Sequence, residues 1–231
     1  LFAAKFGDWK ILFLVFGIVS ILTALWLGST KIVETELEET KATFASSFKL
    51  LGNNFILLMV LSIFVVVGVD VGFNSNSGQF LMKKFGIDQV AAENGRSIYF
   101  FGRMLGTFLG ALMLTRISSR KFFMWTSILG ILCLVAILLV KSSGLAWFLV
   151  FMIGLAVANI WPLVFSIAVS RYPARSNEIS GLMMMAISGG AVIPLLVGWI
   201  SDLSTISIGM TLLVACMIYL WAVSLYCLKH E

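Results

Sequence analysis

Polar side chains interrupt an otherwise apolar stretch of the sequence at residues 68–79. Those that could bind a polar ligand are Asp70, Asn74, Asn76 and Gln79. On a continuous helix, Asp70 and Asn74 share one face because they are four residues apart. Asn76 and Gln79 lie three apart on a different face, unless the glycines break the helix. Such groups can simply join neighbouring helices, but that explanation is less favoured for so many in one segment. We therefore expect a polar cavity beside it.

A second group of candidate ligands follows at residues 96–103. Arg96, Tyr99 and Arg103 recur at helical spacing and share one stripe. Arg103 lies too far from the nearest loop to be only a helix-end residue whose stem reaches the membrane surface. We expect it to form an ion pair or to contact a ligand, with Asp70 as one candidate partner. Glycines at four-residue spacing allow close contact with another helix in this segment: Gly102, Gly106 and Gly110.

The third group lies at residues 159–162. Asn159 falls inside an apolar segment, and Pro162 can kink that segment because it removes a helical hydrogen bond. Trp161 lies about 200° round the helix from Asn159. A packing role for this indole is therefore as well supported as a place in a cavity, which would need the kink to turn it inward. We include Asn159 and Trp161 among the expected ligand-binding residues.

Sites for enzyme chemistry are absent from the sequence. Its one histidine is His230, and it has no HExxH, nucleophile-elbow or phosphate-loop motif. The three cysteines lie inside apolar segments without metal-ligand spacing. We therefore expect a protein that is not an enzyme and has no catalytic residues, no metal site and no cofactor. The net charge of +5 comes from lysines and arginines in short loops, so nucleic acid is not an expected partner.

The elements that must position these residues are helix-length apolar segments. Hydrophobic residues make up 60% of the 231 residues and charged residues 12%, with a mean hydropathy of +1.05. Soluble domains are about 45–50% apolar and about 25% charged. A span needs about 20 mostly apolar residues, and helices satisfy every backbone polar group in lipid. We predict an all-α integral membrane protein with seven spans, at residues 9–28, 55–82, 96–115, 122–140, 145–169, 179–200 and 206–228.

A hydrophilic connection at residues 29–54 separates the first span from the other six. It is rich in glutamate and lysine, and we expect it to contain a surface helix. Lysine and arginine favour cytoplasmic loops, and more of them lie on the side of this connection and of the C-terminus than on the other side. We therefore predict a transmembrane helix at residues 1–28, a cytoplasmic linker at 29–54 and a six-helix bundle at 55–231. The first residue then lies outside, which is natural for a fragment that begins before a sixth helix.

The six spans of the bundle form two triplets. The first span of each triplet, at residues 55–82 and 145–169, contains the glycine, asparagine or proline interruptions. Interrupted helices at matching positions of inverted repeats are the best sequence indication of a transporter's binding site near the membrane midplane. We therefore expect two inverted three-helix repeats with a ligand site between them.

Several motifs resemble those of one known family. Residues 154–165 and 181–202, which include the double glycine Gly189-Gly190, are similar to the tenth and eleventh helices of the fucose–galactose–glucose:proton symporters. Residues 67–71 resemble the seventh helix of that group, and residues 99–106 resemble its eighth. The group belongs to the major facilitator superfamily, and the resemblance covers nearly the whole chain, from the sixth to the twelfth helix.

The resemblance implies a transporter with twelve helices in two six-helix halves. It implies alternating-access uptake of a monosaccharide, of the fucose, glucose or galactose type, together with protons. This chain would be the C-terminal half with the preceding helix, and the missing N-terminal half would carry the principal proton-binding acids. The implied location is the cell membrane, in bacteria the inner membrane, with a cytoplasmic C-terminus. The implied partners are the sugar, protons, the lipid bilayer and the missing half.

Departures from the family pattern keep alternatives open. Asp70 stands where the group usually has glutamate, and residues 114–121 lack the acidic residue of the superfamily. Asn159 and Ile160-Trp161 replace a serine and a methionine-phenylalanine pair, so the sugar could differ from fucose. One alternative is an exporter of drugs or metabolites on the same fold, although its binding surface would be apolar and aromatic. Another is a seven-helix receptor, which the absence of receptor motifs and of a lysine in the last span disfavours.

Overall fold

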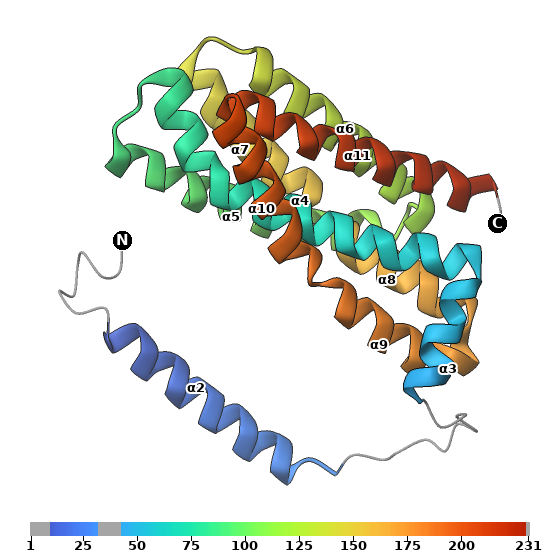
Figure 1. Cartoon of the computed structure of the whole chain (residues 1–231). Helices are drawn as coiled ribbons and strands as arrows, with labels where there is room; N and C mark the ends of the chain where they lie inside the picture. The colour runs from blue at the N-terminus through green and yellow to red at the C-terminus, as the bar shows by residue number, and fades with distance from the viewer. Residues whose placement is uncertain (1–9, 32–42, 230–231) are drawn as a thin grey trace. The chain divides into compact units, whose positions relative to one another are not determined.

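The computed structural model describes residues 10–31 and 43–229, apart from the side chain of Leu12. All regular secondary structure in these two ranges is helical, as the apolar segments predict. Contacts divide the chain into two units, Leu1–Glu38 and Glu39–Glu231. Their helices are drawn in Figure 1.

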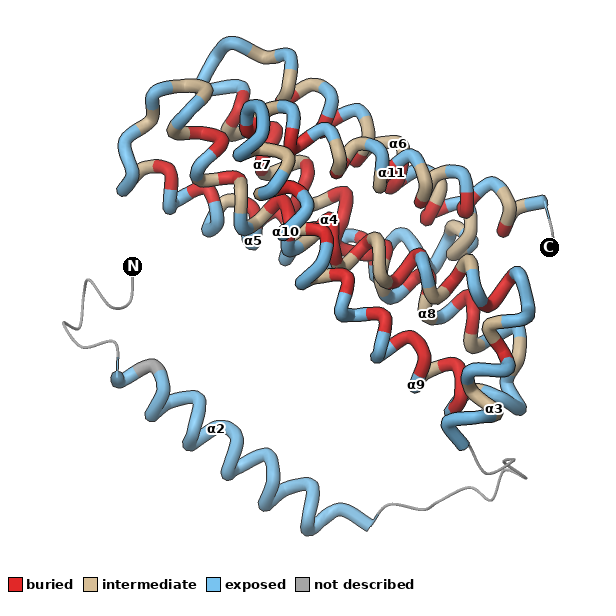
Figure 2. Tube along the Cα trace, viewed as in Figure 1, coloured by how far each residue is buried: buried red, intermediate tan, exposed pale blue. Residues whose placement is uncertain are grey.

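The first unit contains one described helix, α2 (Lys10–Ser29). Its described side chains are exposed, with Phe13 at 68% and Trp26 at 74%, so the tube in Figure 2 is pale blue along this helix. A helix that is apolar all round suits a lipid environment better than a water-facing surface. The helix predicted at residues 9–28 is thus present, and its apolar stretch within the described residues is Phe13–Ser29.

The second unit is a bundle of helices joined by short turns. Its helices are α3 (Phe44–Lys49), η1 (Leu50–Gly52), α4 (Asn54–Phe85), α5 (Gln89–Met113), α6 (Ser119–Leu139), α7 (Ser143–Val157), α8 (Ile160–Arg171), η2 (Pro173–Arg175), α9 (Ser176–Ala186), α10 (Gly189–Leu203) and α11 (Ile206–Lys229). Five stretches in the described part are long and apolar enough to cross a membrane: Asn54–Phe85, Ser119–Leu139, Ser143–Arg171, Pro173–Leu203 and Ile206–Lys229. The protein is a multi-pass membrane protein.

Helix α5 covers the segment predicted as the third span but is not among these five stretches. It begins at Gln89 instead of residue 96, and it carries three charged side chains, Glu93, Arg96 and Arg103. Charged residues lower its hydropathy, so length and composition alone do not mark it as a span. It nevertheless packs into the bundle, against α7 and α4.

The expected interruption of the polar segment at residues 68–79 is wrong. Helix α4 is continuous over 32 residues, and in the described part only Gly86, which caps its C-terminal end, has a positive φ, of 65°. Asn76 fits within the helix because its Nδ2 donates to the carbonyl oxygen one turn earlier, at 2.9 Å. A Cβ on Gly68 would lie 2.7 Å from Cβ of Ile193 in α10. The glycine therefore makes room for a neighbouring helix and does not break its own.

Two other spans are interrupted, α7–α8 at residues 158–159 and α9–α10 at residues 187–188. Pro162 lies in the first turn of α8, where its missing N–H would have had no partner within the helix. At the second interruption the N–H of Ser188 donates to the carbonyl oxygen of Met185 at 3.2 Å, which tightens the chain to a 3₁₀ turn. The interrupted spans are consecutive, so they do not occupy the matching positions expected of two triplets.

Helix α4 contacts most of the long helices of the bundle, and α6 runs beside α11 (Figure 1). Small residues let α5 and α7 approach closely. A Cβ on Gly106 would lie 2.6 Å from the carbonyl oxygen of Leu155, and one on Gly154 would lie 3.1 Å from the carbonyl carbon of Tyr99. Such backbone-to-backbone contact holds α5, and hence its polar side chains, in a fixed position against its neighbours.

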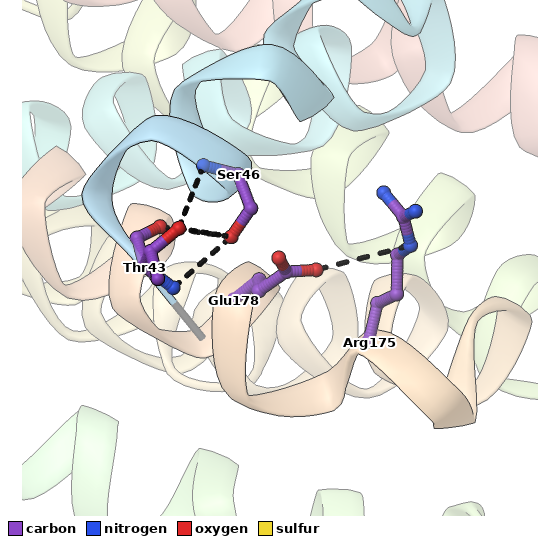
Figure 3. A network of polar contacts seen from close by, with 4 residues as sticks. All are labelled: Thr43, Ser46, Arg175 and Glu178. Atoms are coloured by element: carbon purple, nitrogen blue, oxygen red, sulfur yellow. Dashed lines mark hydrogen bonds and ion pairs between the residues drawn. The ribbon is translucent and has the colours of Figure 1, made fainter. Parts of the chain in front are cut away.

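The linker is described from Thr43 onward, where α3 begins with a capping box (Figure 3). The N–H of Ser46 donates to Oγ1 of Thr43 at 3.2 Å, and the N–H of Thr43 donates to Oγ of Ser46 at 3.0 Å. This helix confirms the short surface helix, whereas the acidic stretch at residues 32–42 lies outside the described residues.

Figure 3 also draws Glu178, 3% exposed, whose Oε2 lies 3.8 Å from Nε of Arg175.

Candidate functional site

The carboxylate of Asp70 on α4 lies against two side chains of α5. The Tyr99 hydroxyl donates to Oδ1 of Asp70 at 2.5 Å, and Nη1 of Arg103 forms an ion pair with Oδ2. Tyr99 is fully buried, while the side chains of Asp70 and Arg103 are 18% and 32% exposed. We call these three residues the inner cluster. The structure thus confirms Asp70 as the ion-pair partner of Arg103.

The inner cluster keeps hydrogen-bonding capacity for a ligand. Asp70 and Arg103 balance each other's charge. A single unpaired charge among apolar helices would cost free energy of folding. A guanidinium has five N–H donors, and among the described residues Arg103 uses Nη1 alone. The remaining donors can reach a hydroxyl oxygen without breaking the ion pair.

Asn74 lies one turn along α4 from Asp70, on the same helical face. Its side chain is half-buried, and its Oδ1 is buried without a hydrogen-bond partner among the described residues. Leaving a buried acceptor unpaired costs about 1–3 kcal/mol. A ligand hydroxyl that displaced the groups covering this oxygen would remove that cost, so Asn74 remains a candidate ligand-binding residue.

Two other residues predicted from α4 do not join the inner cluster. Asn76 is half-buried and spends its Nδ2 on the helix backbone. Gln79 is exposed and lines a separate pocket of about 310 Å³ where α4 ends and α5 begins. We call this the end pocket; its lining residues are Ser75, Gly78, Gln79, Met82, Gln89, Ala92, Glu93 and Arg96.

The residues predicted around the α7–α8 interruption have structural partners. Asn159 is buried, and its Nδ2 donates to the carbonyl oxygen of Gly106 at 2.7 Å, so it ties the start of α8 to α5. It also borders a mostly apolar pocket of about 190 Å³. Trp161 is half-buried and stacks on Phe165, with ring centroids 5.4 Å apart and planes 13° apart. A ligand-binding role for Asn159 and Trp161 remains a prediction.

Sequence reasoning missed the assembly of the end pocket. Gln89, Glu93 and Arg96 recur at helical spacing in the first turns of α5, and this polar stripe was the available signal. It was hidden because the span was expected to begin only at residue 96.

Among the described residues, no three histidine, cysteine, aspartate or glutamate side chains gather as a metal site would require.

Comparison with known proteins identifies the family of this chain. The profile of the Major Facilitator Superfamily matches residues 1–194. A putative glucose/galactose transporter of Helicobacter pylori is 28% identical over 82% of this chain and 46% of its own length. A glucose/galactose transporter of Brucella abortus is 27% identical over 71% of this chain and 40% of its own. The chain therefore spans about half the length of these relatives or less.

Solved structures agree at the level of the fold. The transporter FucP in its outward conformation, a fucose:proton symporter of E. coli, superimposes with a TM-score of 0.84 at 16% identity, over 94% of this chain and 54% of FucP. A bacterial homologue of the human lysosomal transporter Spinster, inward-facing, gives a TM-score of 0.58 at 19% identity, over 96% of this chain and 60% of that one. The match to the Major Facilitator Superfamily over residues 1–194 overturns the alternative of a seven-helix receptor. The chain belongs to the Major Facilitator Superfamily, and its fold is part of the transporter fold of that family.

Proposed function

We propose that this chain is part of a secondary active transporter that takes up a monosaccharide together with protons by alternating access. The observation that carries the proposal is the buried, unpaired Oδ1 of Asn74 one turn from the Asp70–Arg103 ion pair. The names of the relatives support the substrate class, because two of them are described as glucose/galactose transporters. The fucose:proton symporter with the same fold supports the proton as coupling ion.

The chemistry of the inner cluster suits a sugar. Each sugar hydroxyl both donates and accepts a hydrogen bond. One hydroxyl can donate to Oδ1 of Asn74, while its neighbour accepts from an unused N–H of Arg103. Because the ligand would satisfy groups that the protein leaves unpaired, its binding gains more than a surface hydrogen bond would. We keep Asp70, Asn74, Tyr99 and Arg103 as the primary sugar-binding set. Asn76, Asn159 and Trp161 are secondary candidates because they lie outside the inner cluster and each contacts another group of the protein.

The rest of the assignment follows from the family and the loop charges. Residues 1–28 would be the sixth helix, residues 29–54 a cytoplasmic linker, and residues 55–231 the C-terminal six-helix half, which joins an N-terminal half outside this sequence. The C-terminus would be cytoplasmic and the membrane a bacterial inner membrane. The protein would act as a transporter and not as an enzyme. It would need no cofactor.

Sugar-driven proton movement tests this function directly. The full-length protein, reconstituted in vesicles with a pH-sensitive dye inside, should acidify the lumen when fucose, glucose or galactose is added outside. Lumenal pH should not change with the mirror-image sugar. No proton movement with any hexose or deoxyhexose would contradict the symport mechanism. Export of apolar compounds in the same vesicles would instead favour the drug or metabolite exporter.

A further inference from the structure

The end pocket differs from the inner cluster in having no assigned role. It lies where the C-terminal turns of α4 meet the N-terminal turns of α5, next to the turn at Gly86. We propose that it is a second, shallow sugar subsite that receives the substrate before it reaches the inner cluster. This inference rests on the proposed sugar transport.

The chemistry of its lining matches a polyhydroxylated ligand. The pocket offers one hydroxyl, two carboxamides, one carboxylate and one guanidinium, from Ser75, Gln79, Gln89, Glu93 and Arg96. Together they supply both donors and acceptors, as a ligand with several adjacent hydroxyl groups requires. The carboxylate and guanidinium have opposite charges, so the pocket carries no net charge that would favour an anion or a cation.

These side chains are also free to bind. Within residues 43–229, none of the five side chains has a hydrogen bond or an ion pair to the protein. All five are exposed, so water occupies their donors and acceptors until a ligand replaces it. In the inner cluster, by contrast, Asp70 already accepts from Tyr99 and Arg103.

Small residues keep the pocket open between the two helices. Ala92 is only 1% exposed, and a Cβ on Gly78 would lie 3.7 Å from its carbonyl oxygen. Larger side chains at these two positions would fill the space between α4 and α5. The volume of about 310 Å³ is at the lower end of the range for small-molecule sites, about 300–1,000 Å³.

The pocket and the inner cluster lie along the same pair of helices. Gln79 follows Asp70 by nine residues, about 13.5 Å along α4 at 1.5 Å per residue. On α5, Arg96 precedes Arg103 by seven residues, about 10 Å. The pocket's end of α4 also contacts the end of α6, because Nζ of Lys84 donates to the carbonyl oxygen of Ile137 at 3.0 Å. In the proposed orientation this end of the bundle faces outside, where an incoming sugar would first meet the protein.

Exposed, hydrated groups without an aromatic ring to stack on a sugar bind weakly. The subsite would therefore act on capture of the substrate and not on the transport step. Its loss should raise KM for sugar uptake and leave the maximal rate unchanged, because the inner cluster is intact.

The test is the kinetics of sugar uptake by the full-length protein in vesicles, with Gln79→Leu and Glu93→Leu as variants. We expect KM to rise about threefold to tenfold in each, the equivalent of one lost hydrogen bond, at an unchanged maximal rate. Asn94→Leu is the matched control, because this exposed carboxamide lies on α5 beside the pocket but does not line it. It should leave KM as in the unmodified protein.

The outcomes separate the subsite from the transport function. If the unmodified protein shows no saturable sugar uptake, the proposed function fails. If it transports sugar but both pocket variants keep its KM, the end pocket is not a subsite. A fall in maximal rate at constant KM would also overturn the subsite, because it would assign these side chains a structural role.

Discussion

The inner cluster and the end pocket are built from the same two helices, yet their polar side chains behave in opposite ways. In the inner cluster Tyr99 and Arg103 are both bonded to Asp70, whereas the polar side chains of the end pocket are bonded to no protein group within residues 43–229. Depth explains the contrast. Among apolar helices an unpaired charge is costly, while at the polar end of the bundle water satisfies the same groups. Asn74 is the exception, because it is placed deep and left unpaired.

Removal of one partner of the inner cluster should have the largest effect. Arg103→Ala leaves the Asp70 carboxylate without its countercharge. We expect a loss of up to about 3 kcal/mol in stability, the lower end for a buried pair because the two side chains are partly exposed. Sugar uptake should fall at least tenfold. Thermal unfolding in detergent and vesicle uptake measure the two effects. The double variant Asp70→Asn/Arg103→Gln should recover stability but not uptake; recovered uptake would reduce the pair to a structural role.

Close packing of α5 on α7 should be nearly as sensitive. Gly106→Ala places a Cβ 2.6 Å from the carbonyl oxygen of Leu155, and overpacking of this kind costs about 1–3 kcal/mol. Gly181→Ala on α9 is the control, because nothing lies within 4 Å of the added carbon. Equal unfolding temperatures for the two variants would contradict the close approach of the helices.

A moderate effect is expected at the α7–α8 interruption. Asn159→Ala removes the hydrogen bond to the carbonyl oxygen of Gly106, which is worth about 1 kcal/mol. If the residue serves only this contact, stability falls while sugar affinity stays the same. A drop in sugar affinity at unchanged stability would place Asn159 in the binding site after all. Thermal unfolding with and without sugar distinguishes these results.

The smallest effect on stability is expected in the end pocket. Gln79→Leu changes an exposed side chain without a hydrogen bond to the protein within the described residues, and such surface changes are usually within about 0.5 kcal/mol. Unfolding of this variant in detergent should match that of Asn94→Leu. A destabilisation as large as that of Arg103→Ala would remove the distinction between the two regions.

Much of the fold could be predicted from the sequence, because apolar segments of this length have few alternatives to helix. The pairing of Asp70 with Arg103 was also accessible, since two opposite charges in apolar helices need each other. The continuity of α4 was not predictable from its glycines, which support either a break or a close contact until the neighbouring Ile193 is known. The polar stripe of the end pocket on α5 was visible in the sequence but lay before residue 96, where the span was expected to begin. Its meeting with α4 was not predictable, because it depends on which faces of the two helices pack together.

The most direct test of the account is the substitution Asn74→Leu. Leucine has a shape similar to that of asparagine but lacks the unpaired buried oxygen. The sugar-free protein should therefore be as stable as before or more stable by about 1 kcal/mol. Sugar binding should weaken at least tenfold, because a ligand hydroxyl loses its acceptor. Asn94→Leu should change neither quantity. Equilibrium sugar binding and thermal unfolding of the full-length protein measure both. A variant that binds sugar as tightly as the unmodified protein would contradict the placement of the site at Asn74.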